Sequence, residues 1–90
     1  MALSEDGIEK RLAHLEQLRV GVLDEMEEAD AELSRLRMRI ERLESEIRLG
    51  AEPSEEYDRI KGHAMPAAEA RLVQLYRDLL KIEEKICVTR

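Results

Sequence analysis

The sequence predicts an all-α fold: an antiparallel helical hairpin of the coiled-coil type with a kinked or broken second arm, packed as a dimeric four-helix bundle. Three observations lead to this prediction. Apolar residues recur at alternating steps of three and four along two segments, a spacing that fits helices and no strand period. A glycine and a proline separate these segments. The 90 residues, of which 40% are charged and 2% aromatic, allow a single domain (1–90) with little material for a globular core.

The first helix is expected over residues 4–49, where no proline interrupts the pattern. Ser4 offers a capping hydroxyl at its start, and Glu5 and Asp6 suit the positive end of the helix dipole. Its seam, the stripe that faces the other arm, holds eight apolar residues: Val22, Met26, Ala29, Leu33, Leu36, Ile40, Leu43 and Ile47. The same register runs back through one charged and three apolar residues: Arg19, Leu15, Leu12 and Ile8.

The second arm is expected to run back along the first, because Gly50 ends the first helix and the turn, over 50–53, is short. A short helix over 54–62 begins with a serine cap. A kink or break follows near Pro66, because proline removes a helical hydrogen bond and crowds the preceding turn. The last helix is expected over 66–88, and its seam holds six apolar residues: Ala68, Leu72, Leu75, Leu79, Ile82 and Ile86.

Folding the two arms about residue 51 predicts their alignment. Ala29 then lies opposite Leu72. Arg19, the one charge on the first seam, comes near Glu83 and Glu84 and is expected to pair with them. Because the second arm is the shorter one, the first residues of the chain, to about residue 14, are expected to overhang it.

Apolar side chains outside the two seams exceed what two helices can bury against each other. This excess is typical of a homodimer that forms a four-helix bundle, or of a protein with a groove for a helical partner. The residues expected to carry association are four on the first arm and three on the last: Ile8, Leu12, Leu18, Leu23, Val73, Tyr76 and Leu80.

Charges on the first helix come in two blocks. Six acids within residues 24–32 precede four arginines within residues 35–42. Two copies of this helix that cross antiparallel near residue 34 would match acid to base. The alternative is a solvated flank with ordinary local pairs such as Arg37 to Glu41.

The net charge of −6 disfavours nucleic acid and anionic membranes as partners, because both would repel the chain. No apolar run is long enough to span a bilayer, and the N-terminal residues lack the hydrophobic core of a secretion signal. A soluble, cytoplasmic protein is therefore expected. The single cysteine, Cys87, fits a reducing compartment and leaves a disulfide between two copies open.

No catalytic, cofactor-binding or metal-binding residue is expected, nor a small-molecule substrate, so the sequence predicts no enzyme. His14 and His63 lie far apart, and neither has a second ligand at helical spacing. The serines show no nucleophile elbow, and the glycines form no phosphate-binding loop. On an exposed helical rod, nothing would raise the pKa of a carboxylate toward the range that acid–base catalysis needs.

Two sets of residues resemble known families. Residues 4–10, 54–57 and 69–72, with Leu15 and Leu18, resemble the N-terminal coiled coil of Gre-type transcript-cleavage factors. In this chain the first arm is much longer, and the asparagine of that family's tip motif is absent. The resemblance implies a hairpin that enters RNA polymerase with four acids at its tip, here Glu52, Glu55, Glu56 and Asp58.

The second set is similar to tubulin-binding cofactor A, a small helical-bundle chaperone, and consists of Lys10, Arg11, Leu12, Pro66, Arg71, Leu72, Tyr76, Asp78 and Leu79. The arm lengths of that chaperone also differ from those expected here. The function expected from the residues themselves is a non-enzymatic protein–protein interaction, scaffold or adaptor module that works through coiled-coil oligomerisation. A Gre-like regulator with an acidic tip and a cofactor A-like chaperone are the alternatives.

Overall fold

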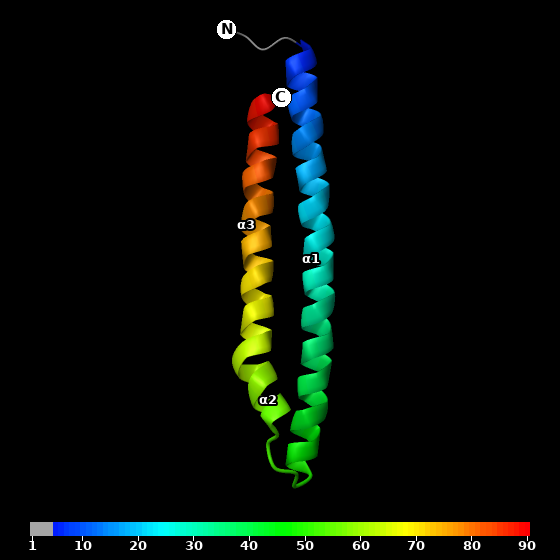
Figure 1. Cartoon of the computed structure of the whole chain (residues 1–90), viewed down its shortest axis with the longest axis vertical. Coiled ribbons are helices and arrows are strands. Elements are labelled where there is room, and N and C mark those ends of the chain that lie inside the picture. Colours follow the sequence, from blue (N-terminus) through cyan, green and yellow to red (C-terminus); the bar gives the residue numbers. More distant parts are fainter. Residues whose placement is uncertain (1–4) are drawn as a thin grey trace.

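The computed structural model describes residues 5–90 and shows two antiparallel helical arms joined by one tight turn (Figure 1). The first arm is α1 (Glu5–Arg48). The second arm consists of α2 (Glu55–Arg59), the π-helical turn η1 (Ile60–Ala64) and α3 (Met65–Thr89). The molecule is a rod with extents of 70 × 15 × 15 Å. The expected all-α helical hairpin is confirmed.

The long helix α1 sets the length of the rod. Its 44 residues, at a rise of ~1.5 Å each, span almost the whole 70 Å extent. Glu5 and Asp6 lie in its first turn, where the helix dipole favours negative charge. The helix start expected at Ser4 lies outside the described residues, and the C-terminal end at Arg48 comes one residue before the expected one.

The turn after α1 is a Schellman motif built around Gly50. Gly50 has φ of 108°, in the left-handed region that side chains other than glycine rarely adopt. The Ala51 N–H donates to the Glu46 carbonyl at 3.0 Å, and the Gly50 N–H donates to the Ile47 carbonyl at 3.0 Å. Free carbonyls at the end of α1 are thereby satisfied, and the chain reverses.

The second arm is continuous, so the expected break at Pro66 is wrong, and the irregularity of the arm is the π-helical turn η1 just before the proline. The arm runs without interruption from α2 through η1 into α3. In η1 the Met65 N–H donates to the carbonyl of Ile60, five residues back, as in a π-helix. Pro66 stands in the first turn of α3, where its missing N–H has no partner to lose within that helix. The expected short helix 54–62 therefore ends at Arg59 and passes into η1.

The extra residue of η1 explains how the seam stays aligned. Inward-facing residues of the second arm follow one another at steps of three, four, four, four, three and four, one residue more than a strict heptad repeat allows. The π-turn absorbs that residue, so α2 and α3 both turn their apolar stripes toward α1. These inward residues are Tyr57, Ile60, Ala64, Ala68, Leu72, Leu75 and Leu79.

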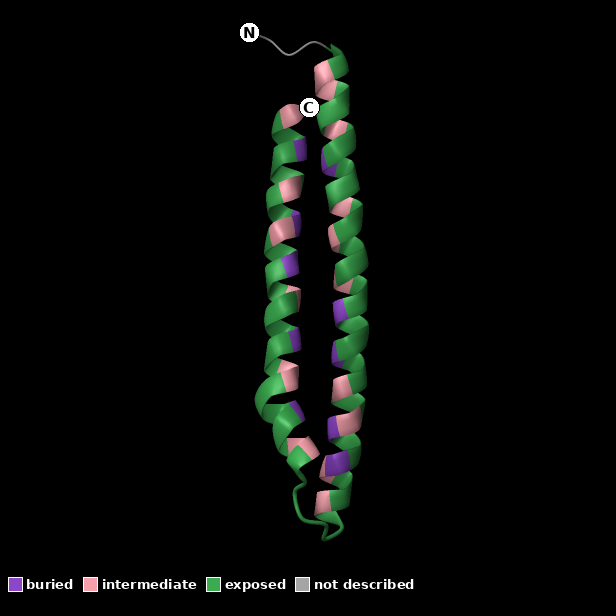
Figure 2. Ribbon diagram, viewed as in Figure 1, coloured by how far each residue is buried: buried purple, intermediate pink, exposed green. Residues whose placement is uncertain are grey.

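Buried residues follow the facing sides of the two arms (Figure 2). Near the turn, Ile40 and Leu43 of α1 pack with Ile60, and Leu36, Tyr57 and Met65 cover this cluster. Among the described residues, no buried polar side-chain atom lacks a hydrogen-bond partner. The buried residues are Leu15, Ala29, Leu33, Ile40, Leu43, Ile60, Ala68, Leu75, Leu79 and Ile86.

The open end of the hairpin differs from the expectation in two ways. The continuous α3 reaches Thr89, and Arg90 Nη2 lies 3.5 Å from Glu16 Oε1. The overhang of α1 is therefore shorter than the expected 14 residues. Arg19 forms no ion pair with Glu83 or Glu84 among the described residues, and that prediction is wrong. Arg19 is half-buried on the seam, and the acid of α1 that meets a cation of the second arm at this end is Glu16 instead.

Candidate protein-interaction surface

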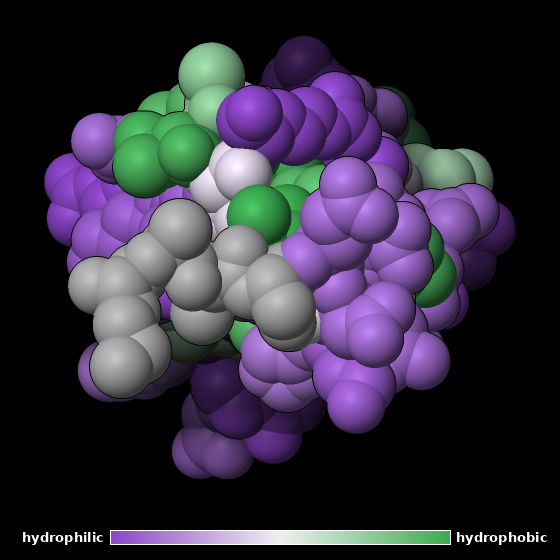
Figure 3. Space-filling model, turned by 90° about the horizontal axis from the view of Figure 1, so that it is seen from above, coloured by the Kyte–Doolittle hydropathy of each residue, from purple (hydrophilic) through white to green (hydrophobic). Residues whose placement is uncertain are grey.

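Five exposed apolar residues share one flank of the hairpin by their helical register, and we call this the apolar flank: Val20 and Leu23 of α1 with Val73, Tyr76 and Leu80 of α3. Each of these five residues is between 45% and 54% exposed. Seen from the open end, hydrophobic residues reach the surface in patches between hydrophilic ones (Figure 3). Exposed apolar residues on both arms make this flank a candidate contact site.

A groove of about 550 Å³ shows that both arms contribute to this flank. Val73 and Tyr76 of α3 line it together with Glu27 and Asp30 of α1. The other three members follow from the helical repeat, because residues one heptad apart share a side of a coiled-coil helix. Val20 precedes Glu27 by one heptad, Leu23 precedes Asp30, and Leu80 follows Val73.

The floor of the groove belongs to the seam itself. Met26 and Leu72 are seam residues, yet both stay half-buried and line the groove. Ala29, which is 0% exposed, has the smallest side chain of the α1 seam and fills little of the space at this level. The hairpin alone therefore leaves part of its own seam open. Glu27 and Asp30 give the α1 edge of the groove a negative charge.

The structure brings four of the seven predicted association residues together and separates the other three. Leu23, Val73, Tyr76 and Leu80 all lie on the apolar flank. Leu18 is 44% exposed but stands two heptads before Glu32, which pairs with Arg71 at 3.9 Å on the opposite flank. Ile8 and Leu12 are half-buried and lie near the open end of the hairpin, away from this group.

The sequence prediction did not include Val20, Met26 and Leu72 among the association residues. Val20 lies one heptad after Ala13 and one heptad before Glu27, and this spacing places it on a flank of the seam. The exposure of Met26 and Leu72 has no sequence signal, because seam residues are expected to be buried. Their exposure depends on how closely the two arms approach at Ala29.

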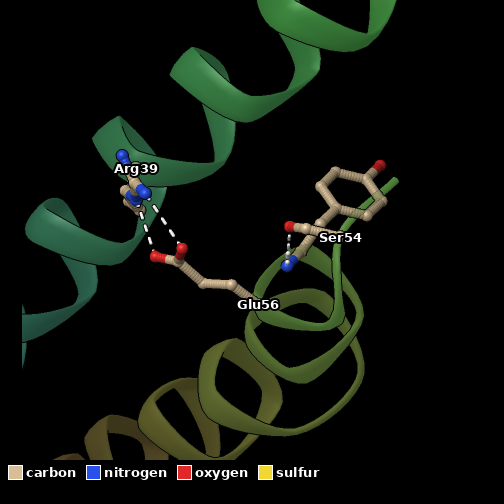
Figure 4. Close-up of polar contacts among 4 residues, drawn as sticks. Arg39, Ser54 and Glu56 are labelled. Atoms are coloured by element: carbon tan, nitrogen blue, oxygen red, sulfur yellow. Dashed lines mark hydrogen bonds and ion pairs between the residues drawn. The ribbon is translucent and has the colours of Figure 1, made fainter. Parts of the chain in front are cut away.

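The opposite flank is held by ion pairs between the arms. Arg39 Nε donates to Glu56 Oε1 at 2.7 Å, and Arg39 Nη2 donates to Glu56 Oε2 at 2.9 Å (Figure 4). This two-pronged geometry fixes both side chains. The hydrogen bond from Arg39 lowers the pKa of the Glu56 carboxyl, and the same bond raises the pKa of the Arg39 guanidinium. Arg71 and Glu32 add a longer contact on this flank.

At the tip, three of the four predicted acids are free. Glu52, Glu55 and Asp58 are exposed and form no ion pair among the residues described. Glu56 instead turns toward α1 and binds Arg39 (Figure 4). The tip backbone is fixed by Ser54, whose hydroxyl accepts a hydrogen bond from the Tyr57 N–H at 3.1 Å.

Beside the tip, Tyr57 also contacts a cation. Lys61 Nζ donates to the Tyr57 hydroxyl at 2.9 Å and lies 5.3 Å from the centre of its ring. The hydrogen bond to Tyr57 raises the pKa of Lys61. The acids of the tip are therefore bordered by this ammonium on the second arm.

Within the described part of the chain, no group of three or more His, Cys, Asp and Glu side chains is placed to hold a metal ion. His14 and His63 are both exposed, and so is the Cys87 thiol. Over residues 5–90, no helix combines the length and the apolar character needed to cross a membrane.

Comparison of the chain with protein-family models, with curated proteins and with solved structures finds no match. The resemblances to Gre-type factors and to tubulin-binding cofactor A therefore assign no role to any residue. Function is inferred from the surfaces of the hairpin itself.

Proposed function

We propose that this protein is a non-enzymatic interaction module of the scaffold or adaptor type, and that it works by pairing with a second copy through the apolar flank. The observation that carries the proposal is that both arms leave apolar residues exposed on the same flank, Leu23 and Val20 on α1 and Tyr76 on α3, with a groove between the arms there. Two such faces packed together make a four-helix bundle.

The physical argument is the burial of apolar surface. Removing apolar area from water contributes about 25 cal/mol per Å². In the isolated hairpin, Leu23, Val73, Tyr76 and Leu80 each keep close to half of their surface in water. A second copy would cover them and also close the groove above Met26 and Leu72.

The exposed thiol of Cys87 fits a reducing compartment, and we propose that the protein is cytoplasmic.

The proposal is tested by charging the flank. Tyr76→Asp with Leu80→Asp places two carboxylates in the proposed interface, so at about 500 mM salt, which screens contacts between exposed charges, the protein should elute from size exclusion with the mass of a monomer and retain its helical circular dichroism. Met38→Asp with Val88→Asp is the matched control. These residues are 71% and 81% exposed and lie outside the apolar flank, so this variant should stay dimeric. Association of the first variant that survives at this salt concentration would overturn the proposal.

One observation favours a second candidate, a regulator whose acidic tip enters an enzyme channel. Glu52, Glu55 and Asp58 are exposed together at the closed end of a narrow rod. For this function, their replacement by glutamine and asparagine would abolish activity toward RNA polymerase without changing assembly. Glu56 must be kept in this experiment, because its loss would also remove the contact to Arg39.

A further inference from the structure

A second surface of α1 lies away from the apolar flank and carries opposite charges in two blocks. We call it the charge-block face. Its acidic half holds Glu25 and Glu28, and its basic half holds Arg35 and Arg42, all exposed. A groove of about 320 Å³ runs through the basic half, lined by Arg35, Met38, Arg39 and Arg42.

The position of this face follows from the ion pairs of the hairpin. Glu25 precedes Glu32 by one heptad, and Glu32 contacts Arg71 on the flank opposite the groove of Tyr76. Arg35 and Arg42 stand four residues before and three residues after Arg39, so they share a side of the helix with it. The charge-block face and the apolar flank therefore lie on different sides of the rod.

The hairpin uses only part of these charges. Glu32 is engaged by Arg71, and Arg39 is engaged by Glu56. Glu25, Glu28, Arg35 and Arg42 take part in no ion pair among residues 5–90. The face also carries two apolar residues: Ala31 between the two blocks and the 71% exposed Met38 within the basic half.

We propose that the charge-block face binds the same face of a second copy, with the two α1 helices antiparallel and crossing near residue 34. In this arrangement Glu25 meets Arg42 of the second copy. Glu28 lies between Arg35 and Arg42 of the second copy, and Met38 packs on Ala31 of the second copy. Because the contact is two-fold symmetric, each of these interactions occurs twice. A parallel arrangement would instead place acid beside acid and base beside base.

This interface is independent of the apolar flank, and the two together have a consequence for assembly. A rod with two self-complementary faces on different sides can join dimers into larger species. The charge-block contact depends on exposed charges, so it is screened by salt, with a Debye length of ~10 Å at 0.1 M ionic strength. The apolar contact depends on burial and resists such screening. Salt should therefore dissociate the larger species to dimers.

The experiment measures weight-average mass by sedimentation at high protein concentration, in about 50 mM and about 500 mM salt. The wild-type chain should exceed the dimer mass at low salt and return to it at high salt. Arg35→Glu with Arg42→Glu, and separately Glu25→Arg with Glu28→Arg, should remain dimers at both salt concentrations. An equimolar mixture of these two variants should recover the larger species at low salt, because opposite charges again face each other.

The matched control is Arg77→Glu with Lys81→Glu, which makes the same charge change on exposed positions of α3 and should assemble like the wild type. Failure of the mixture to recover the larger species, or assembly of the wild type that is independent of salt, overturns the proposal. Tyr76→Asp with Leu80→Asp separates the two interfaces. In that background the charge-block face alone should give a salt-sensitive equilibrium between monomer and dimer.

Discussion

Arg39 of α1 and Glu56 of α2 join the two arms of the hairpin through two parallel hydrogen bonds of 2.7 and 2.9 Å. They are 17 residues apart in sequence, and the turn at Gly50 lies between them. The pair fixes the direction in which the second arm leaves the turn. It also engages one of the four acids of the tip, so the unpaired charge of the tip is smaller than its sequence suggests.

This pair makes stability depend on pH. The bond from Arg39 lowers the pKa of Glu56 below its ordinary value of 4.5. A carboxyl with a lowered folded-state pKa stabilises the fold above its unfolded-state pKa, and this contribution is lost as the pH falls through the folded-state pKa. Glu56→Gln should therefore lower the Tm at pH 7, and the difference from wild type should vanish in acid. The thermal melts are followed by circular dichroism.

The control for this prediction is Glu55→Gln, because Glu55 is the adjacent acid and forms no ion pair within the described chain. It should not reproduce the loss of stability at pH 7. A Glu56→Gln variant that melts with the wild type at every pH would show that the Arg39 contact contributes nothing to stability.

The turn and the middle of α1 predict opposite effects of one substitution. Gly50→Ala forces a side chain into a left-handed backbone conformation and should destabilise the hairpin by about 1–2 kcal/mol. The Cβ that Gly21→Ala adds on the exposed side of α1 has no atom within 4 Å, so this substitution should stabilise the hairpin by about 1 kcal/mol. Urea unfolding at equal protein concentration measures both. Equal effects of the two substitutions would contradict this account of the turn.

The seam should be far more sensitive to truncation than the outer surface. Leu33 is 3% exposed, so Leu33→Ala should cost about 2–5 kcal/mol through lost burial and the cavity left behind. Met38→Ala removes a side chain that is 71% exposed and should change the free energy of unfolding by less than about 0.5 kcal/mol. A small effect at Leu33 would mean that the arms do not pack as described.

The π-turn η1 predicts an unusual tolerance to deletion. Removing His63 together with Pro66→Ala returns the second arm to a strict heptad repeat, so Tyr57 and Ile60 still face α1 and the Tm should be kept or raised. Deleting the exposed Gln74 instead rotates one part of α3 relative to the other and should lower the Tm strongly. The idea fails if the first deletion destabilises as much as the second.

Local signals were sufficient to predict the architecture. The spacing from Val22 to Ile47 predicted a seam, Gly50 predicted the reversal, and Ser54 predicted the cap of the second arm. Each signal depends on neighbours within one or two helical turns, and such neighbours can be read from the sequence.

The remaining features depend on the exact separation and rotation of the two arms. Pro66 signalled a disturbance, but proline is compatible with a break, a kink or a π-turn, and only packing against α1 selects among them. The binding of Glu56 to Arg39 joins residues on different arms, so no spacing along the chain indicates it. The register of the seam places Leu18 and Leu23 on opposite flanks, but which flank carries the groove and which carries the ion pairs depends on the side chains of α3.

The central claim is that the apolar flank pairs two copies of the chain. Sedimentation equilibrium tests it most directly, in reducing buffer so that the exposed Cys87 cannot link copies, at moderate salt and over a range of micromolar concentrations. The account predicts a dimer mass that falls toward the monomer at the lowest concentrations. A monomer mass at every concentration would contradict it, because Leu23, Val73, Tyr76 and Leu80 would then stay open in solution.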